Sequence, residues 1–341
     1  MNDNINDKHE MIGFKDQFAE IQTAIDSFRS GQKKNIAIIA ELFGGKTTLL
    51  DEIERMNMQN VTKVSFLSNV KDISEFAVEN ENQIVIFDNC EFLYKRRIGG
   101  FDILDEFLKT VVSSDNMFIT TWNAYSWNYL DAAINISKIF PIQIKLSKFS
   151  VDDIKQSLLS TYKEDEIQFV DDIAIKKDKL VKLMKYPLNM VPLKKPINIP
   201  YIKINRDILK IRLSKKKENI TVQDIIFGKI HHISNGNPGI AEIIWQKSIE
   251  YPIIKPSMIE KLSFNIDLDY NEAFILSIIL SMKSIKRDDL VEIVGSDFRI
   301  DSIIFTLLKQ DLITISNNNF MIKLEALQSI VEFLKKLRLV W

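Results

Sequence analysis

A glycine-bearing turn followed by a lysine and two threonines is the part of this sequence whose residue types and spacing fit a defined chemistry. Residues 36–50 read I-A-I-I-A-E-L-F-G-G-K-T-T-L-L, so the turn lies between an apolar run and the start of an amphipathic stretch. Gly44 and Gly45 let backbone N–H groups turn inward, and a helix beginning at Lys46 directs its positive end at an anion. Lys46 can then reach the outer phosphates of ATP, while the Thr47 hydroxyl can hold Mg²⁺. This order predicts a phosphate-binding loop.

The loop departs from the usual pattern at its first position, where Ala40 replaces a glycine. Because alanine tolerates most loop conformations, we interpret this as a mild departure. The alternative is that G-G-K-T forms an ordinary surface turn. Its position after an isoleucine-rich run and before a helix favours binding of ATP or ADP. The predicted nucleotide contacts are Ala40, Gly44, Gly45, Lys46, Thr47 and Thr48.

A second candidate is an aspartate at the end of the apolar run I-V-I-F-D, some forty residues after the lysine. A buried strand that ends in Asp88 would place this carboxylate beside Thr47, where both can hold Mg²⁺. The glutamate that polarises water in fast ATPases usually follows such an aspartate directly, but here Asn89 follows it. Glu91 is therefore the candidate catalytic base, and we expect hydrolysis to be slow.

A third strand end, I-T-T-W-N, supplies polar groups where a sensor of the γ-phosphate would lie. Thr121 is the stronger candidate and Asn123 lies behind it. The alternative role for both residues is to cap the helix that begins near Ser126.

These side chains require a sheet to position them. Helices are expected at 16–28, 47–56, 73–79 and 101–112, and strands at 35–40, 61–67, 83–88 and 116–121. Such alternation predicts an α/β fold with a mostly parallel sheet flanked by helices. In such sheets ligands bind at the carboxyl ends of the strands, which is where the candidate residues fall.

Length and composition are consistent with an intracellular ATPase. The 341 residues allow two or three domains, and 46% apolar residues suffice for their cores. The single cysteine, Cys90, excludes a disulfide framework, and the three histidines lack the partners of a zinc site. No apolar run approaches the ~18 residues of a membrane span, and the polar N-terminus does not resemble a signal peptide. We therefore expect a cytoplasmic protein.

The net charge of −1 hides a strong asymmetry. Residues 176–217 contain fourteen Lys and Arg against two acids, a balance of +12, which leaves −13 for the remainder. Four prolines in this stretch forbid a continuous helix, and alternating segments such as Y-I-K-I-N favour short strands. The segment is interpreted as a basic arm or hairpin that contacts DNA or another anionic partner, or alternatively as a solvated loop.

The C-terminal part, from residue 267, reads as three helices followed by two short strands around an Asn-rich turn, which predicts a winged helix. Its third helix offers Arg299 and Lys309 against Asp297 and Asp301, a poor match for phosphates. Residues 267–341 contain nine basic and eleven acidic side chains. We therefore expect this domain to pack on the ATPase domain rather than to read base pairs. The last helix, 324–339, is expected to pack in the core, although an exposed Trp341 would suggest a docking surface for a partner chain.

Taken in order, the motifs M-I-G-F-K-D-Q-F, G-G-K-T, I-F-D-N, I-T-T-W and S-N-G-N-P-G-I-A-E resemble the STAND and archaeal-type ATPases, signal-transducing relatives of the AAA+ and origin-recognition ATPases. The resemblance implies that the region 11–18, with Met11, Ile12 and Gly13, lies over the adenine. It also implies that Pro238, in a G-x-P motif of a helical lid, contacts the nucleotide.

Some features depart from that family. Trp122 stands where the family often has an arginine, and residues 124–141 contain no arginine to serve as a finger for a neighbouring subunit. Arg96 and Arg97 could act in trans instead. A histidine of the wing can touch the nucleotide in the family, and here Lys323 is its speculative substitute. These departures favour a switch over a hydrolysing ring.

The sequence thus predicts a P-loop ATPase domain at 1–150, a helical lid at 151–264 with a basic insertion at about 185–217, and a winged-helix domain at 265–341. The expected function is a slowly hydrolysing, nucleotide-dependent switch that uses ATP/ADP and Mg²⁺. A DNA-binding initiator-like ATPase and a non-hydrolysing nucleotide-gated scaffold remain alternatives. A protein partner or a homo-oligomer is also possible, because no sensor or effector domain is recognised in the chain.

Overall fold

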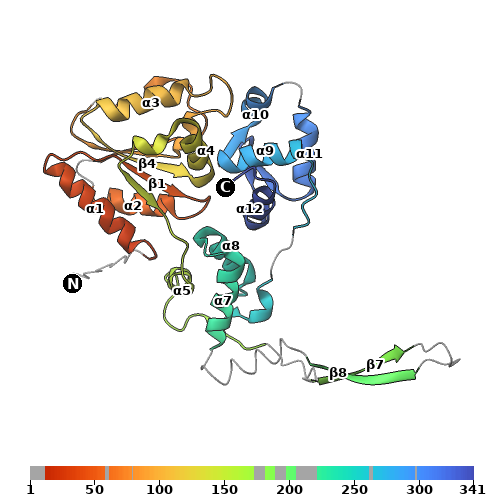
Figure 1. Ribbon diagram of the computed structural model, residues 1–341. Coiled ribbons are helices and arrows are strands. Elements are labelled where there is room, and N and C mark those ends of the chain that lie inside the picture. The colour runs from red at the N-terminus through yellow and green to blue at the C-terminus, as the bar shows by residue number, and fades with distance from the viewer. Residues whose placement is uncertain are drawn as a thin grey trace, which may run out of the picture.

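The computed structural model describes residues 12–57, 61–78, 80–172, 181–188, 197–204, 221–260, 264–295 and 298–341, of which 181–188 and 197–204 are described as backbone alone. Figure 1 shows three groups of elements: an α/β domain, a helical group that we call the lid, and a C-terminal domain. Within the described residues, no helix combines the length and the apolar character needed to cross a bilayer.

The α/β domain contains a five-stranded parallel sheet in the order β2-β3-β4-β1-β5. The strands are β1 (Ile36–Ala40), β2 (Val61–Ser65), β3 (Ile84–Asp88), β4 (Met117–Asn123) and β5 (Ile142–Lys145). Every residue of β1, β3 and β4 is buried, which explains the apolar runs of β1 and β3, whereas β4 also buries the polar residues Thr120, Thr121 and Asn123. The α/β prediction is confirmed.

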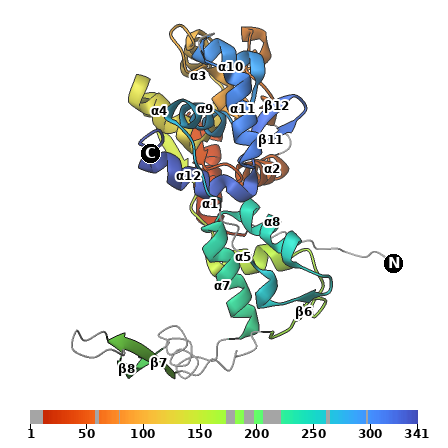
Figure 2. The same ribbon diagram turned by 90° about the vertical axis from the view of Figure 1, so that its right-hand side faces the viewer.

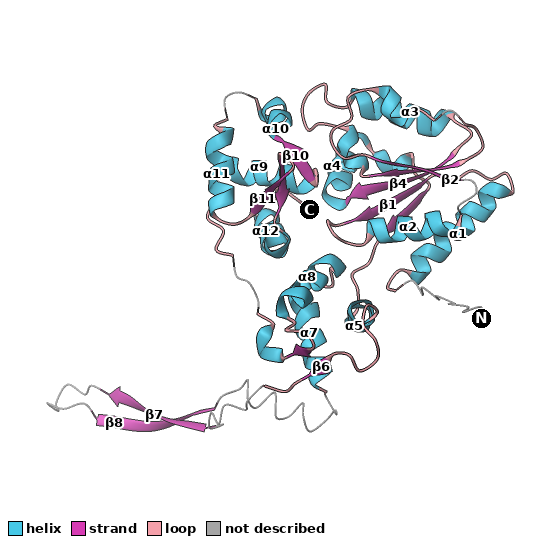
Figure 3. Cartoon of the chain, turned by 180° about the vertical axis from the view of Figure 1, so that it is seen from behind, coloured by secondary structure: helices cyan, strands magenta, loops and turns pink. Residues whose placement is uncertain are grey.

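Helices cover both faces of this sheet, as Figure 3 shows from behind. They are α1 (Lys15–Arg29), α2 (Lys46–Met56), α3 (Asp102–Ser113) and α4 (Ala124–Ile134). Ile36 and Ile38 of β1 share a core with α1 and α2, whereas Ala37 and Ile39 belong to the core of α3 and α4. The alternation of side chains along β1 thus fills two separate cores.

One predicted helix is wrong. A helix is predicted at 73–79, but in the described part of this segment, residues 73–78, the structure has a 3-10 turn at Ile73–Phe76. Asp72 and Glu75 cap this turn reciprocally, and Ala77 is already extended, so the capping chemistry closes a single turn without propagation.

The lid contains α5 (Val151–Leu159), α7 (Val222–Ser234) and α8 (Pro238–Ser248), with a small parallel pair of β6 (Gln168–Phe169) and β9 (Ile253–Ile254). The stacked rings of Phe227 and Trp245 join α7 to α8. Within the predicted basic arm, β7 (Val181–Leu188) pairs antiparallel with β8 (Ile197–Ile204), and this hairpin extends away from the lid (Figure 1). The rest of 176–217 lies outside the described residues, so a DNA or other anionic partner stays a prediction.

The C-terminal domain contains α9 (Tyr270–Ser281), β10 (Ser284–Lys286), α10 (Arg287–Val294), α11 (Ile300–Lys309), β11 (Ile313–Ser316), β12 (Asn319–Ile322) and α12 (Leu327–Lys336). Its strands form an antiparallel sheet in the order β10-β12-β11. Asn317 and Asn318 both have positive φ angles, as the turn of a tight hairpin requires.

This domain packs on the α/β domain, as expected from its charge. A single cluster of buried apolar residues runs from β1, β3 and β4 through α3 and α4 into α9, α11 and α12. Seen from the side in Figure 2, the C-terminal domain also lies next to α8 of the lid, where Lys247 pairs with Glu325. Trp341 is 55% exposed, and its backbone carbonyl accepts a hydrogen bond from Asn128.

Candidate functional site

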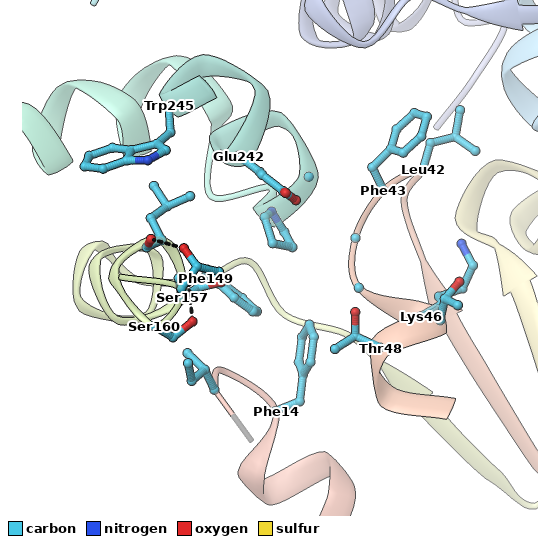
Figure 4. Close-up of a pocket in the computed structure, with 18 of the residues that line it drawn as sticks. Phe14, Leu42, Phe43, Lys46, Thr48, Phe149, Ser157, Ser160, Glu242 and Trp245 are labelled. Atoms are coloured by element: carbon cyan, nitrogen blue, oxygen red, sulfur yellow. Dashed lines mark hydrogen bonds between the residues drawn. The ribbon is translucent and has the colours of Figure 1, made fainter. Parts of the chain in front are cut away.

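A cavity of 690 Å³ lies between the loop after β1, the segment before α1, and the lid helices α5 and α8. Figure 4 shows Trp245 and Glu242 on the lid side of this cavity, and Lys46 and Thr48 on the loop side. Lys283 of the C-terminal domain also lines it. All three groups of elements therefore contribute to one site.

The loop has the backbone that its glycines allow. Gly45 precedes α2 with a φ of 87°, and a Cβ at this position would lie 2.6 Å from the ring of Phe14. A Cβ on Gly44 would lie 3.0 Å from the carbonyl oxygen of Glu41, to which Gly44 donates its N–H at 3.2 Å. Only glycine fits position 45 without displacing the segment that leads into α1.

Lys46 is buried at the first position of α2, with an exposed fraction of 8%. Its ammonium lies 3.3 Å from the carbonyl oxygen of Ala40 and 3.4 Å from that of Glu41. Burial lowers the pKa of Lys46, and the carboxylate of Glu91 opposes this effect. Thr47 and Thr48, at the start of the same helix, are exposed on the cavity wall.

Asp88 and Thr121 lie together at the ends of neighbouring strands. Thr121 donates its hydroxyl hydrogen to Asp88 Oδ1 at 2.5 Å, and the backbone N–H of Asn89 lies 3.0 Å from the same oxygen. Both side chains are buried, and the described residues that line the cavity include Asn89 but not Asp88 or Thr121. The strand β1, the glycine-bearing loop after it and the helix α2 form one unit with Asp88 at the end of β3. This is the P-loop NTPase fold.

Glu91 is fully buried behind these strand ends. Its Oε2 accepts the backbone N–H of Asn123 at 3.1 Å, and no group among the described residues hydrogen-bonds its Oε1. Burial raises the pKa of Glu91, and the ammonium of Lys46 partly offsets the effect. A buried carboxylate with a raised pKa and an unpartnered oxygen takes up a proton more readily than an exposed carboxylate does.

Asn123 caps α4, in agreement with the alternative role that the sequence indicates for it. Its Oδ1 accepts the N–H of Tyr125 at 3.0 Å, so α4 begins at Ala124, two residues earlier than expected. Its Nδ2 donates to the carbonyl oxygen of Leu280 in the C-terminal domain at 2.8 Å. Asn123 thus links a strand end to α9.

The opposite end of the cavity is apolar and aromatic. Ile12, Phe14, Phe149, Pro238 and Trp245 line it, so these side chains can enclose a flat ring. Gly13 has a φ of 80°, and a Cβ there would lie 2.4 Å from the ring of Phe149. Met11 lies outside the described residues.

The start of α8 holds the loop in place. Asn237 caps this helix through its Oδ1 and donates its Nδ2 to the carbonyl oxygen of Leu42 at 2.8 Å. The N–H of Gly239 donates to the carbonyl oxygen of Phe43 at 3.2 Å, and a Cβ on Gly239 would lie 2.7 Å from Phe43 Cβ. The G-x-P region therefore contacts the loop directly.

Sequence reasoning missed Lys283 and chose Lys323 as the basic residue of the wing. Lys323 pairs instead with Asp311, whereas Lys283 reaches the cavity and donates to Asn89 Oδ1 at 2.8 Å. The signal in the sequence was slight: a lysine directly after a helix, where glycine or asparagine is usual.

Arg96 and Arg97 contact the C-terminal domain of the same chain. The guanidinium of Arg96 lies 4.5 Å from the ring centre of Tyr129 and 5.4 Å from that of Phe274, and Arg97 pairs with Glu292 at 2.7 Å. These intrachain contacts give both arginines a structural role and argue against action in trans.

Comparisons with solved structures return proteins that cover most of this chain at low sequence identity. The RuvB Holliday junction branch migration motor from Thermotoga maritima is 14% identical, with 94% of this chain and 95% of that chain covered and a TM-score of 0.42. ORC2 from Aeropyrum pernix, in ADPNP and ADP complexes, is 11% identical, with 97% of both chains covered and a TM-score of 0.45. Cdc6p from Pyrobaculum aerophilum is 14% identical, with 96% and 94% covered and a TM-score of 0.43.

No model of a protein family matches the sequence, and no curated protein matches it.

Proposed function

We propose that this protein binds ATP and ADP with Mg²⁺, hydrolyses ATP slowly and acts as a nucleotide-dependent switch of the AAA+/STAND type. The observation that supports the proposal is that one cavity is lined by the P-loop, by the lid and by a lysine of the C-terminal domain. A ligand that contacts all three parts can change how strongly they hold together.

At the phosphate end, the N-terminus of α2 and Lys46 would bind the phosphates, with Gly44 and Gly45 shaping the loop. The carbonyl contacts of Lys46 are long, at 3.3 and 3.4 Å, so phosphate oxygens can replace them. The described residues contain no group of three or more His, Cys, Asp or Glu suited to a metal ion. In the proposed function, a Mg²⁺ ion would be held by Thr47, by Asp88 and by the phosphates themselves.

At the base end, Ile12, Phe14 and Pro238 would enclose the adenine or ribose. The aromatic rings of Phe14 and Phe149 are 5.0 Å apart in an edge-on arrangement, which leaves an apolar wall suited to a flat ring. The hydroxyl groups that line the α5 side of the cavity can accept hydrogen bonds from the base or donate them to it.

Hydrolysis is proposed to be slow because the candidate base lies beneath the cavity wall. Glu91 is fully buried and Asn89 occupies the wall position after Asp88. A proton from the attacking water would have to reach Glu91 Oε1 past this wall. Thr121, which bonds Asp88, would act by orienting that carboxylate toward the metal.

The switch is proposed to act on the C-terminal domain, which we assign as a winged helix. The order α9, β10, α10, α11, β11 and β12 supports this assignment, and buried hydrogen bonds join the end of α9 to α4 and β4. Loss of the γ-phosphate would change the electrostatics beside these bonds and alter the balance between docked and released states.

Isothermal calorimetry of wild type, Lys46→Ala and Lys34→Ala with magnesium-ATP and magnesium-ADP tests the proposal. Lys34 is an exposed lysine that precedes β1, so its variant is the matched control. We expect wild type and Lys34→Ala to bind alike and Lys46→Ala to lose binding. Equal titrations for all three proteins would refute a nucleotide site at this loop. Phosphate release measured in parallel separates slow hydrolysis from a non-hydrolysing scaffold.

A further inference from the structure

Lys283 has an unusual backbone for a lysine. It follows the end of α9 with a φ of 60°, the left-handed region in which glycine or asparagine normally ends a helix. A non-glycine side chain in this region strains the backbone, because its Cβ crowds the neighbouring carbonyl oxygen. Such strain is a reason to ask what the side chain does.

The side chain of Lys283 points from the C-terminal domain to the cavity of the α/β domain. Its ammonium donates to Asn89 Oδ1 at 2.8 Å, one residue beyond Asp88. Lys283 and Lys46 line the same cavity; burial is the main cause that lowers the pKa of Lys46, and the charge of Lys283 adds to this effect. Two ammonium groups that repel each other across one cavity form a site for a polyanion.

The backbone that carries Lys283 is fixed to the α/β domain. The carbonyl groups of Leu280 and Ser281 belong to the last turn of α9, where no intrahelical donor is available. Asn123 Nδ2 donates to the first at 2.8 Å and Ser126 Oγ donates to the second at 2.7 Å. These buried bonds hold the turn at 282–283 against the strand ends that carry Asp88 and Asn89.

We propose that Lys283 binds the terminal phosphates of the nucleotide from the C-terminal domain, so that the nucleotide fastens this domain to the P-loop. The inference rests on the proposed function and extends it, because it makes the C-terminal domain part of the binding site. Phosphate oxygens relieve the repulsion between Lys46 and Lys283, and they replace Asn89 as the partner of the ammonium. Nucleotide binding and domain docking therefore strengthen each other.

The test compares magnesium-ATP binding by wild type, Lys283→Gln, Lys283→Arg and the control Lys286→Gln. Lys286 is an exposed lysine three residues further along. Removing a charge-assisted contact should weaken binding about 10- to 100-fold in Lys283→Gln. Lys283→Arg should retain most of the affinity and Lys286→Gln all of it. Hydrogen exchange of α9 amides, measured with and without ATP, reports docking: ATP should slow it in wild type but not in Lys283→Gln.

Affinity for Lys283→Gln within about twofold of wild type, or ATP protection of α9 that survives this substitution, would overturn the inference. In that case a loss of binding in Lys46→Ala still upholds the proposed function, so the two failures are distinguishable. If neither wild type nor Lys46→Ala binds, both proposals are wrong.

Discussion

Replacement of Asn123 by alanine tests the interface between the sheet and the C-terminal domain. The side chain has no exposed surface and makes two hydrogen bonds, to the N–H of Tyr125 and to the carbonyl oxygen of Leu280. Its backbone N–H, which Glu91 accepts, is retained in the variant. The substitution therefore removes a helix cap and a domain contact and leaves the Glu91 contact in place.

The expected cost follows from these two bonds. Loss of an N-cap costs about 1 kcal/mol. The carbonyl oxygen of Leu280 would remain buried without its donor, which costs a further ~1–3 kcal/mol. We expect the free energy of unfolding to fall by about 2–4 kcal/mol, because the two effects act on different elements. Asn128→Ala, which removes an exposed contact to Trp341, should cost about 0.5–1 kcal/mol.

Urea unfolding, followed by tryptophan fluorescence and by circular dichroism, measures both variants against wild type. Two probes are needed because a chain with several domains can unfold in more than one step. If Asn123→Ala is no less stable than Asn128→Ala, the Asn123 amide does not hold the domains together. The hydrogen bond to the carbonyl oxygen of Leu280 would then not fix the end of α9 to the sheet.

Two further predictions concern the loop and the buried acid. Gly45→Ala should lower stability by about 1–3 kcal/mol and weaken magnesium-ATP binding, because the new Cβ would meet Phe14; Gly31→Ala, with a φ of 92° and no atom within 4 Å, controls for the backbone alone. Glu91→Gln should abolish phosphate release while ATP still binds. Burial raises the pKa of Glu91 above 4.5, so the folded state retains a proton that the unfolded state releases. The free energy of unfolding of wild type therefore falls as pH rises from the unfolded-state pKa to the folded-state pKa of this group. Glu91→Gln should lose this dependence; if the difference in unfolding free energy between wild type and Glu91→Gln is the same at about pH 4 as at about pH 8, this expectation is contradicted.

Local chemistry was predictable from the sequence wherever one segment determines the outcome. The run 36–48 specifies a buried strand, a loop that needs glycine and a helix start, and all three are present within one residue of the prediction. The paired asparagines at 317–318 similarly specify a hairpin turn. Residues 73–79 show the limit, because helical periodicity says little about a segment whose caps close it after one turn.

Contacts between distant segments could not be predicted in this way. The hydrogen bonds of Lys283 to Asn89 and of Asn123 to Leu280 join residues that are 194 and 157 positions apart. Nothing in the local pattern around Lys283 or Lys323 says which lysine faces the cavity, since that depends on how the C-terminal domain docks. The roles of Arg96 and Arg97 depend on the same docking.

The attachment of Asn237 and Gly239 to the carbonyl groups of Leu42 and Phe43 has a practical consequence for dissecting this protein. A fragment that stops at residue 150 would retain every residue of the P-loop but would lack the donors that hold these two carbonyl groups. Its glycines would then be free to sample other conformations. Weak nucleotide binding by such a truncated protein would reflect the loss of these two hydrogen bonds to the loop. Nucleotide affinity is therefore best measured on the intact chain.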